Sequence, residues 1–323
     1  MRARQAPRVE EAGGAAVTQA EDARPIVQMT RLGRMGRWAN MLFQYAFLRV
    51  YARRRGARVE VPHWAGRDVY GFDDPRPSRA LPEWLEATDP QEQAFPPAGD
   101  EVLDHDFVGY GQVHTSWYAP DREFLCSLYS SPVPAVAARM AGPVAALRSR
   151  GRTVVGVHLR RGDYGQSIFY LTPVEWYLRL LEHLWPTLDA PALFVATEDP
   201  ALVERFAAYH PVTAEGLGVD FRPVAAPGLP HLRPDLVERD ARALDFYPDF
   251  HLLQQCDVML APNSSYSFMA AMLAPTLTQF WRSSLRTQGF AREDPWDAYP
   301  LQHDRVQDFA HVEGVALQAN RYW

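Results

Sequence analysis

A run of β-branched and apolar residues near the middle of the chain ends abruptly in charged ones. Residues 153–159 are typical of a buried parallel strand, and Arg160, Arg161, Gly162 and Asp163 follow directly. An arginine side chain presents a rigid fork of donors that matches phosphate oxygens, and it keeps its charge. Such a run in isolation is more typical of a solvated turn. Because ligands bind at the carboxyl edge of parallel sheets, the preceding strand favours a site for a phosphate-bearing ligand.

A second polar cluster follows a later apolar strand and leads into a helix. Residues 257–261 form that predicted strand, and Asn263, Ser264, Ser265 and Ser267 come after it. Hydroxyls and backbone N–H groups gathered at a helix start can hold an anion. An ordinary helix cap explains one serine, but not three within four positions. We therefore predict a second anion-binding segment at the same sheet edge as the first.

Two carboxylates stand at the end of the strand predicted over residues 192–197. Glu198 and Asp199 could accept hydrogen bonds from the N–H groups of a base, which is how a protein selects guanine over adenine. They could equally cap the helix that Pro200 begins. Local sequence leaves both explanations open.

The Asp104-His105-Asp106 segment raises the alternative of a metal site. An Asp-x-Asp pair can hold a divalent ion that bridges a nucleotide diphosphate. Such pairs are common in proteins, and a solvated turn is the more frequent explanation.

A glycine-containing loop precedes the first long helix. Gly36, Arg37 and Trp38 lead into a helix predicted over about residues 39–55, with Asn40 in its first turn. Backbone N–H groups and the helix dipole can bind an anion at such a loop. A packing turn has the same sequence pattern, so this signal is weaker than the one at residues 160–163.

These segments need a framework of strands and helices to bring them together. In the first half, strands at 26–29 and 58–61 flank the helix at 39–55 and predict a βαβ unit closed by Gly56. Residues 66–106 show no sustained period and predict an irregular insert. The helix carries one apolar stripe for packing against a sheet, made by Phe43, Ala46, Phe47 and Val50. A strand and turn at 107–111 and a helix at about 132–150 complete this half.

The second half alternates strands and helices with short connections, which predicts an α/β fold. A capping box at residues 172–175, with Pro173 as the first helical residue, begins a helix that reaches about Trp185. The other predicted elements are a strand at 192–197, a helix from Pro200, a helix at 249–256, a strand at 257–261, a helix to about Leu273 and a strand at 276–281. Part of the remaining chain is expected to pack back across the first half.

Composition restricts the class of protein. The chain has 323 residues, 47% of them hydrophobic and 22% charged, so it is globular and long enough for two domains. A net charge of -6 argues against a general nucleic-acid-binding protein. The sequence contains no lysine, so all 33 basic residues are arginine and Schiff-base catalysis is excluded. Cys126 and Cys256 give neither a disulfide framework nor a zinc spacing, which favours a reducing compartment.

The hydropathy of the chain gives no sign of membrane insertion. Residues 1–24 lack a continuous apolar core and predict a flexible tail rather than a signal peptide or an anchor. No later run reaches the roughly 18 apolar residues of a membrane span. We expect a cytoplasmic protein, or one bound peripherally to a membrane, without a nucleic-acid partner.

Four segments together give the chain a resemblance to a known family. They are residues 156–164 (GVHLRRGDY), 42–46 (LFQYA) after Asn40, 109–112 (GYGQ) and 263–267 (NSSYS). The chain resembles the α-1,2-fucosyltransferase family and, more distantly, the protein O-fucosyltransferases and the α-1,6-fucosyltransferases. The matching segments are spread over most of residues 26–281.

This resemblance implies an α/β glycosyltransferase of the GT-B type, in which two Rossmann-like domains face a cleft. The expected parts are a flexible tail over residues 1–24, an acceptor-side domain over 25–150, a GDP-sugar-binding domain over 151–290 and a segment over 291–323 that packs back on the first domain. Enzymes of this kind invert the configuration of the sugar and use neither a metal nor another cofactor, with GDP-fucose as the donor substrate.

The resemblance also implies roles for individual residues. Arg160 matches the residue that contacts the donor β-phosphate, His158 lies beside the nucleotide, and Asp163 organises the loop. Asn40 matches an active-site asparagine of the glycine-rich loop. Further donor contacts are expected on guanine and at the phosphates, from Asp199, Asn263, Ser264, Ser265 and Ser267. The acceptor-side loop is expected to contain Gly36, Arg37, Trp38 and Asn40.

The loop over residues 36–41 departs from the Gly-Gly-Leu-Gly-Asn-Gln that is usual in the family. Arg37 and Trp38 are closer to the Gly-Arg-Phe-Gly-Asn of the protein O-fucosyltransferases. Ala39 stands where a glycine is usual and tolerates a positive φ poorly, and Met41 cannot hydrogen-bond as glutamine does. We therefore expect acceptor binding to differ from the family, while the donor half matches it.

The expected reaction is the transfer of fucose from GDP-fucose to a hydroxyl of a galactoside or a related glycan acceptor, with an α-1,2 linkage as the first expectation. A non-catalytic GDP-sugar-binding protein is the main alternative; others are another GDP-sugar, another acceptor, and metal-dependent transfer through Asp104 and Asp106. No general base is identifiable. Asp163 fits by type, but a loop-fixing carboxylate paired with an arginine explains it better. We expect the Arg160 guanidinium to face the cleft between the domains.

Overall fold

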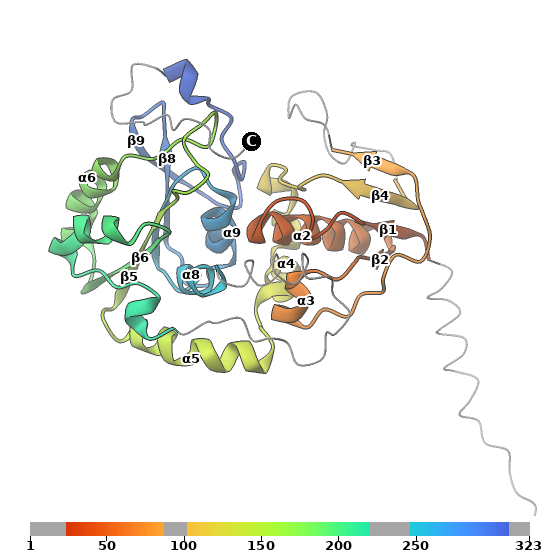
Figure 1. Ribbon diagram of the computed structural model, residues 1–323, viewed down its shortest axis with the longest axis horizontal. Helices are drawn as coiled ribbons and strands as arrows, with labels where there is room; N and C mark the ends of the chain where they lie inside the picture. Colours follow the sequence, from red (N-terminus) through yellow and green to blue (C-terminus); the bar gives the residue numbers. More distant parts are fainter. Residues whose placement is uncertain (1–23, 87–101, 220–245, 310–323) are drawn as a thin grey trace, which may run out of the picture.

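Two β-sheets of mainly parallel strands form the centres of the two halves of the molecule (Figure 1). The structure is a computed structural model, in which residues 24–86, 102–219 and 246–309 are described. Each sheet is built from one half of the chain and has helices packed on it, which confirms the predicted α/β class. The tail expected over residues 1–24 lies outside the described residues except for Arg24.

The N-terminal sheet has four parallel strands in the order β2-β1-β4-β3. Its strands are β1 (Ile26–Gln28), β2 (Arg58–Glu60), β3 (Glu83–Leu85) and β4 (His105–Val108). β1, α2 (Trp38–Arg55) and β2 form the predicted βαβ unit. The insert predicted to be irregular contains helix α3 (Ala65–Tyr70), β3 and the start of β4. Elements of three to six residues are too short to show a hydrophobic period.

Helix α2 is buried around most of its circumference, and not only along the predicted stripe. Leu42, Tyr45 and Leu48 are buried as completely as Phe43 and Phe47. The helix packs on the N-terminal sheet and also against α9 (Ser265–Leu273) of the other half (Figure 1). Because both neighbours exclude water, the sequence of α2 is apolar on opposite faces. The helix ends, as predicted, where Gly56 takes a left-handed φ of 64°.

The C-terminal sheet has five strands in the order β6-β5-β7-β8-β9, of which β9 alone is antiparallel to its neighbour. The strands are β5 (Thr153–Leu159), β6 (Pro191–Thr197), β7 (Val258–Ala261), β8 (Gln279–Ser284) and β9 (Gly289–Glu293). The other α-helices of the described ranges are α4 (Arg122–Tyr129), α5 (Pro134–Arg148), α6 (Val174–Leu184) and α8 (Tyr247–Leu253). Short 3-10 helices are η1 (Thr115–Trp117), η2 (Ala119–Asp121), η3 (Trp185–Thr187), η4 (Pro200–Tyr209), η5 (Glu215–Leu217) and η6 (Val306–Phe309).

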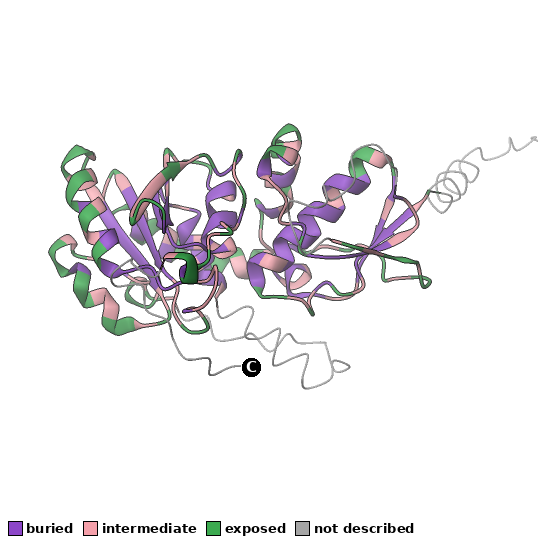
Figure 2. Ribbon diagram, turned by 90° about the horizontal axis from the view of Figure 1, so that it is seen from above, coloured by how far each residue is buried: buried purple, intermediate pink, exposed green. Residues whose placement is uncertain are grey.

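β5 is the buried parallel strand that its sequence predicts. It pairs with β6 on one side and β7 on the other, and its residues from Val154 onward are buried. Figure 2 shows buried strands inside the C-terminal half, with exposed residues on the helices outside them. At Gly156 an added Cβ would come within 2.6 Å of the Cys256 sulfur. The glycine therefore allows the turn after α8 to approach the strand closely.

Two predicted helix starts and one strand differ in detail from the structure. The capping box is wrong, because the Thr172 hydroxyl bonds to Ser283 Oγ at 2.9 Å and Pro173 itself precedes the first helical residue. A partner distant in sequence has taken the hydroxyl that would otherwise cap the helix. Pro200 begins a helix as predicted, but this helix, η4, is of the 3-10 type. β8 begins at Gln279, three residues later than the strand predicted from residue 276.

Apolar and polar contacts join the two halves. Trp38, at the start of α2, packs edge-on against Tyr247 and Phe250 of α8. The segment after β9 reaches the N-terminal half, where the Thr115 N–H and hydroxyl both donate to the Ala298 carbonyl, at 2.9 and 2.8 Å. The halves therefore share packing on the side of α8 and hydrogen bonds on the side of η1.

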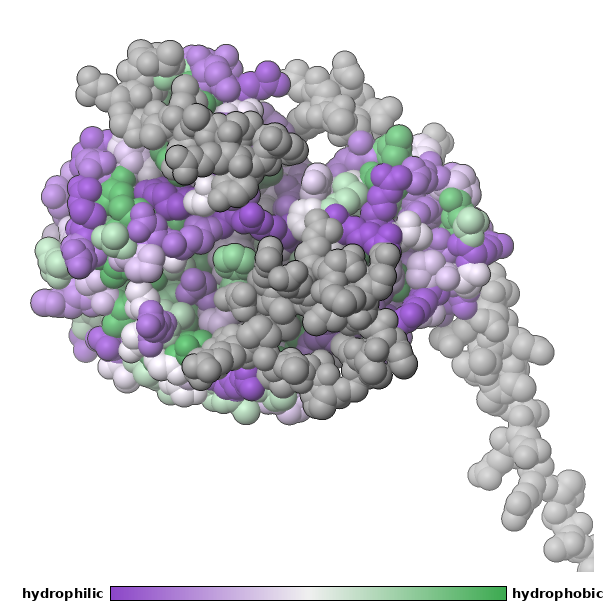
Figure 3. All heavy atoms as spheres, viewed as in Figure 1, coloured by the Kyte–Doolittle hydropathy of each residue, from purple (hydrophilic) through white to green (hydrophobic). Residues whose placement is uncertain are grey.

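The visible surface is mixed in character. On the face shown in Figure 3, hydrophobic residues are scattered among hydrophilic ones. Across residues 24–86, 102–219 and 246–309, no helix combines the length and apolarity that crossing a membrane requires. Cys126 and Cys256 are both free thiols.

Candidate functional site

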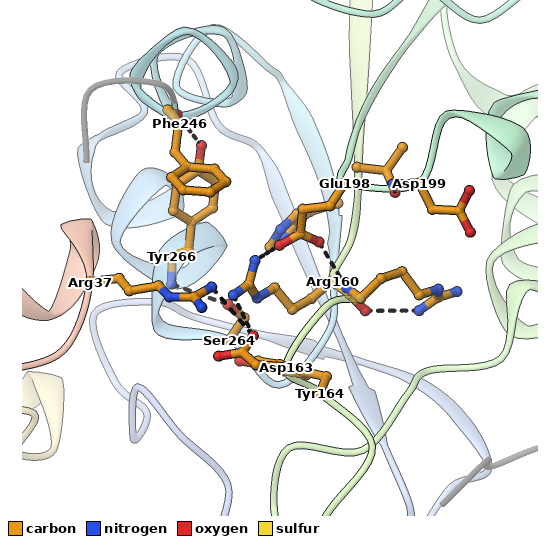
Figure 4. A network of polar contacts seen from close by, with 12 residues as sticks. Arg37, Arg160, Asp163, Tyr164, Glu198, Asp199, Phe246, Ser264 and Tyr266 are labelled. Carbon is orange, nitrogen blue, oxygen red and sulfur yellow. Dashed lines mark hydrogen bonds and ion pairs between the residues drawn. The ribbon is translucent and has the colours of Figure 1, made fainter. Parts of the chain in front are cut away.

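Four segments meet at the carboxyl edge of the C-terminal sheet (Figure 4). Two come from strand ends, the loop after β5 and the residues after β6. The third is the start of α9, and the fourth is the start of α2, which approaches from the N-terminal half. We call residues 160–163 the β5 loop and residues 263–267 the α9 start. Parallel strands bring their carboxyl ends to one edge, which is why segments far apart in sequence converge here.

Arg160 is held at this edge by groups on three sides. Its Nη2 lies 2.6 Å from Asp163 Oδ1, and its Nη1 forms an ion pair with Glu198 Oε1. The ring of Tyr164 stacks on the guanidinium, with its centroid 5.2 Å away. Only 11% of the side chain is exposed, so the guanidinium is not turned into bulk solvent. Its remaining N–H groups can still donate to an anion, because a guanidinium has five of them.

Asp163 lies between two arginines from different halves of the chain. Besides Arg160, it accepts from Arg37 Nη1 at 3.4 Å, and Arg37 precedes the first residue of α2. Gly162 provides the left-handed turn, with φ of 59°, that brings the carboxylate back toward Arg160. This double pairing fits a carboxylate that fixes the loop better than one that acts as a base.

Asn40 connects the N-terminal half to the α9 start. Its Oδ1 accepts from Gln112 Nε2 at 2.6 Å and from the Ser265 hydroxyl at 2.9 Å. A Cβ added at Gly36 would collide with the Asn40 side chain, so the glycine makes room for this asparagine. Ala39 lies inside α2 and needs no positive φ, which removes the strain expected for an alanine in this loop.

Trp38, predicted to be part of an acceptor-side loop, lies in the core instead. It is 1% exposed, begins α2 and stacks on Tyr70 with ring centroids 6.1 Å apart. A residue at this position that was exposed to an acceptor would lose this aromatic packing. Arg37 and Gly36 of this loop stay exposed, and 59% of the Arg37 side chain is accessible.

His158 is buried beneath the β5 loop. Its Nδ1 and the Ser267 hydroxyl are hydrogen-bonded at 2.9 Å, and its ring lies 5.1 Å from that of Tyr266. Burial, together with the charges of Arg160 and Arg161, lowers the pKa of His158 to about 3. The imidazole is therefore neutral at neutral pH, and it can position neighbouring groups but not supply a proton there.

The α9 start uses most of its polar atoms within the protein. Asn263 donates to the carbonyls of Ile168 and Gln302 and accepts from the Gln302 N–H, so both of its side-chain donors and one acceptor position serve the fold. Ser264 caps α9 by accepting from the Tyr266 N–H. Ser267 is fully buried against His158. The contacts of Asn263 and Ser267 oppose a direct phosphate-binding role for these two residues. Ser265 is half-buried and donates its hydroxyl to Asn40.

The two carboxylates after β6 have different roles. Asp199 accepts from the Ala201 N–H at 3.2 Å and caps η4, which was one of its two predicted roles. Glu198 reaches Arg160, a contact that the sequence analysis missed. The signal is the register of the parallel pair, in which Leu159 lies opposite Thr197, so the residues that follow each of them are neighbours.

Asp104 and Asp106, considered for a metal site, are engaged with protein groups. Asp104 accepts from Arg79 at 2.6 Å, and Asp106 accepts from the Thr30 N–H and hydroxyl at 2.8 and 2.5 Å. Within the described part of the chain, no three His, Cys, Asp or Glu side chains are grouped as metal ligands would be. These contacts support a structural role for both aspartates.

Comparisons with known proteins identify the fold. No protein-family model and no curated protein matches the sequence. Several solved structures are similar. The NodZ α-1,6-fucosyltransferase soaked with GDP-fucose has a TM-score of 0.53 at 12% identity, over 84% of this chain and 99% of that one. The fucosyltransferase NodZ from Bradyrhizobium has a TM-score of 0.52 at 13% identity, over 84% of this chain and 99% of that one.

A plant protein has the same fold. A mutant of Arabidopsis thaliana FUT1 in complex with GDP has a TM-score of 0.52 at 11% identity, over 88% of this chain and 78% of that one. Identities this low establish a shared fold for the chain and nothing about its substrate. The site described above therefore has to support any statement about function by its own chemistry.

Proposed function

We propose that the protein transfers fucose from GDP-fucose to a hydroxyl of a galactoside or related glycan acceptor, with inversion and without a metal. The observation that supports this most is the Arg160 guanidinium, held between two carboxylates at the carboxyl edge of β5. That edge is where α/β folds bind nucleotides. Of the structures that share the fold, one was soaked with GDP-fucose and one is a complex with GDP. An α-1,2 linkage is the first product to look for, on the resemblance of the GVHLRRGDY segment.

The proposed architecture is that of a GT-B glycosyltransferase with two Rossmann-like domains. The C-terminal half would bind GDP-fucose, and the N-terminal half would bind the acceptor. Each half has its own mainly parallel sheet, and the contacts of Arg37 with Asp163 and of Asn40 with Ser265 cross between the halves at the proposed site. The acceptor would enter where α2 begins.

In the proposed reaction, negative charge grows on the departing β-phosphate. Arg160 would stabilise that charge, together with the N–H groups at the start of α9. Because Arg160 is already fixed by its neighbours, little reorganisation is needed when the charge develops. Losing one such donor typically costs about 2–4 kcal/mol in the transition state, or about 10²–10³ in rate. Asp163 holds the two arginines in place and is not assigned as the base.

The test is a transfer assay with GDP-fucose and a panel of simple galactosides, with product linkage determined by NMR. Arg160→Ala should lower the rate by about 10²–10³ or more. Arg152→Ala is the matched control, since Arg152 stands before the same strand and pairs with Asp189 at the opposite edge of the sheet. Near-normal transfer by the Arg160 variant would refute the assignment.

Two further arms separate the alternatives. Calorimetry that detects GDP binding, beside neither transfer nor slow hydrolysis of GDP-fucose, would indicate a non-catalytic binding protein. Loss of activity in chelator, restored by a divalent metal, would refute the metal-independent mechanism. Asp104 and Asp106 would then be the first metal ligands to test by substitution.

A further inference from the structure

Glu198 stands beside Arg160 because of the register between their two strands. Leu159 of β5 lies opposite Thr197 of β6, so the next residue of each strand leaves the sheet at the same place. The Glu198 carboxylate turns toward Arg160, whereas the next side chain, Asp199, turns to cap η4 (Figure 4). The contact therefore follows from the sheet itself and not from a surface side chain that happens to lie near.

One carboxylate restrains two parts of the β5 loop. Glu198 Oε1 pairs with the Arg160 guanidinium, and Oε2 accepts from the Arg161 backbone N–H at 2.9 Å. The Glu198 side chain is 27% exposed, so water screens these contacts only partly. With Asp163 at the other guanidinium nitrogen, the Arg160 side chain is fixed from both sides.

We propose that Glu198 is a positioning residue, which holds Arg160 and the β5 loop in the orientation that a departing diphosphate needs. The proposal rests on the proposed fucosyl transfer. Glu198 itself carries the same sign of charge as the diphosphate and repels it. It therefore weakens ground-state binding while it aligns the group that stabilises the transition state, so affinity and rate should respond to its loss in opposite directions.

The decisive variant is Glu198→Gln, which keeps the shape and an oxygen for the Arg161 N–H but removes the charge. We expect GDP to bind about fivefold more tightly, because the variant removes one negative charge that repels the diphosphate at short range in a hydrated site. We expect kcat to fall by about 10- to 100-fold, because the guanidinium is no longer held in place. Asp189→Asn is the matched control, since Asp189 precedes β6 and pairs with Arg152 at the far edge.

A role limited to stability would give a different result. It would weaken GDP binding and slow transfer together, in proportion to a lower melting temperature, and that outcome would overturn the proposal. Unchanged kcat in Glu198→Gln would overturn it as well. If the residue acts through Arg160, Glu198→Gln should add little to an Arg160→Lys variant, whereas additive effects would contradict the positioning role.

Amide hydrogen exchange in the ligand-free protein tests the role of Glu198 independently of fucosyl transfer. The Arg161 amide should exchange its hydrogen at least tenfold faster in Glu198→Ala than in the wild type, and nearly at the wild-type rate in Glu198→Gln. If the wild type transfers no fucose, the proposed function fails, yet amide exchange and GDP affinity still decide the role of Glu198. Equal exchange in all three proteins would refute it.

Discussion

The β5 loop and the α9 start lie at the same sheet edge, and their sequences make similar predictions, but the structure uses them differently. In the β5 loop, charged side chains converge on one point, and Asp163 stays 41% exposed. In the α9 start, Asn263 and Ser267 have no exposed surface and bond to the protein itself. The β5 loop gathers its charged groups at the sheet edge, whereas the α9 start uses its amide and hydroxyl groups in hydrogen bonds within the protein.

The difference follows from the cost of burying each kind of group. A guanidinium or a carboxylate is expensive to bury, so it stays near water or pairs with an opposite charge, as Arg160 does with Asp163 and Glu198. A neutral amide or hydroxyl is satisfied by one to three hydrogen bonds and can be buried completely. Clusters of Asn and Ser at a helix start are therefore weaker evidence for a ligand than clusters of Arg and Asp.

The largest expected effect on the free energy of unfolding is that of Asn263→Ala, in the α9 start. The variant loses three hydrogen bonds at a fully buried position, which should lower the free energy of unfolding by about 3 kcal/mol. Urea unfolding measures the loss. Asn263→Asp is the companion variant, since it keeps the acceptor for the Gln302 N–H but loses both donated bonds. A loss below about 1 kcal/mol would mean that the α9 start is open enough for water to replace these bonds.

The second test uses pH. Burial holds the pKa of His158 at about 3 in the folded protein, against about 6.5 in the unfolded chain. Between these values the unfolded state binds a proton that the folded state does not, so stability is lost as pH falls below 6.5, by up to about 1.4 kcal/mol per pH unit. From pH 7.5 to 4.5, the wild type should lose about 2.5 kcal/mol more than His158→Gln.

The difference between the wild type and His158→Gln removes the contribution of a second histidine, His251. His251 also has a pKa lowered by burial, to about 4, but it is present in both proteins and cancels in the difference. Chemical unfolding at each pH gives the two free energies. Equal losses of unfolding free energy in the wild type and the His158 variant would contradict the conclusion that His158 is buried and neutral beneath the β5 loop.

Much of the site could be predicted because its signals are local. The apolar run of β5, the charged residues after it and the turn at Gly162 are all contiguous, and the structure places them as their sequence indicates. The βαβ unit at residues 26–60 is likewise set by local periodicity. Such features depend on neighbours in sequence, which a single chain displays directly.

The features that sequence analysis missed depend on distant partners. Trp38 looks like a loop residue until α8 packs on it, and Thr172 looks like a helix cap until Ser283 takes its hydroxyl. Glu198 and Asp199 are equivalent by composition, and only strand register distinguishes them. In each case a tertiary contact overrides a local preference.

A smaller effect is expected at the contact between the N-terminal half and the α9 start. Ser265→Ala removes the hydroxyl that donates to Asn40 at 2.9 Å in a partly buried setting, and it should cost about 1 kcal/mol of unfolding free energy. Ser127→Ala is the matched control, because the exposed Ser127 hydroxyl donates to the Phe124 carbonyl of its own helix. Identical urea midpoints for the two variants would show that the Asn40 contact contributes nothing across the halves.

The smallest effect should be at the contact between the N-terminal half and the β5 loop. Arg37 and Asp163 are 59% and 41% exposed and 3.4 Å apart, so water and salt screen their attraction strongly. Arg37→Ala should change the free energy of unfolding by about 0.5 kcal/mol or less, and about 1 M salt should abolish the difference. A cost larger than that of Ser265→Ala would reverse the comparison, since the exposed β5 loop and not the buried α9 start would then bind the two halves together.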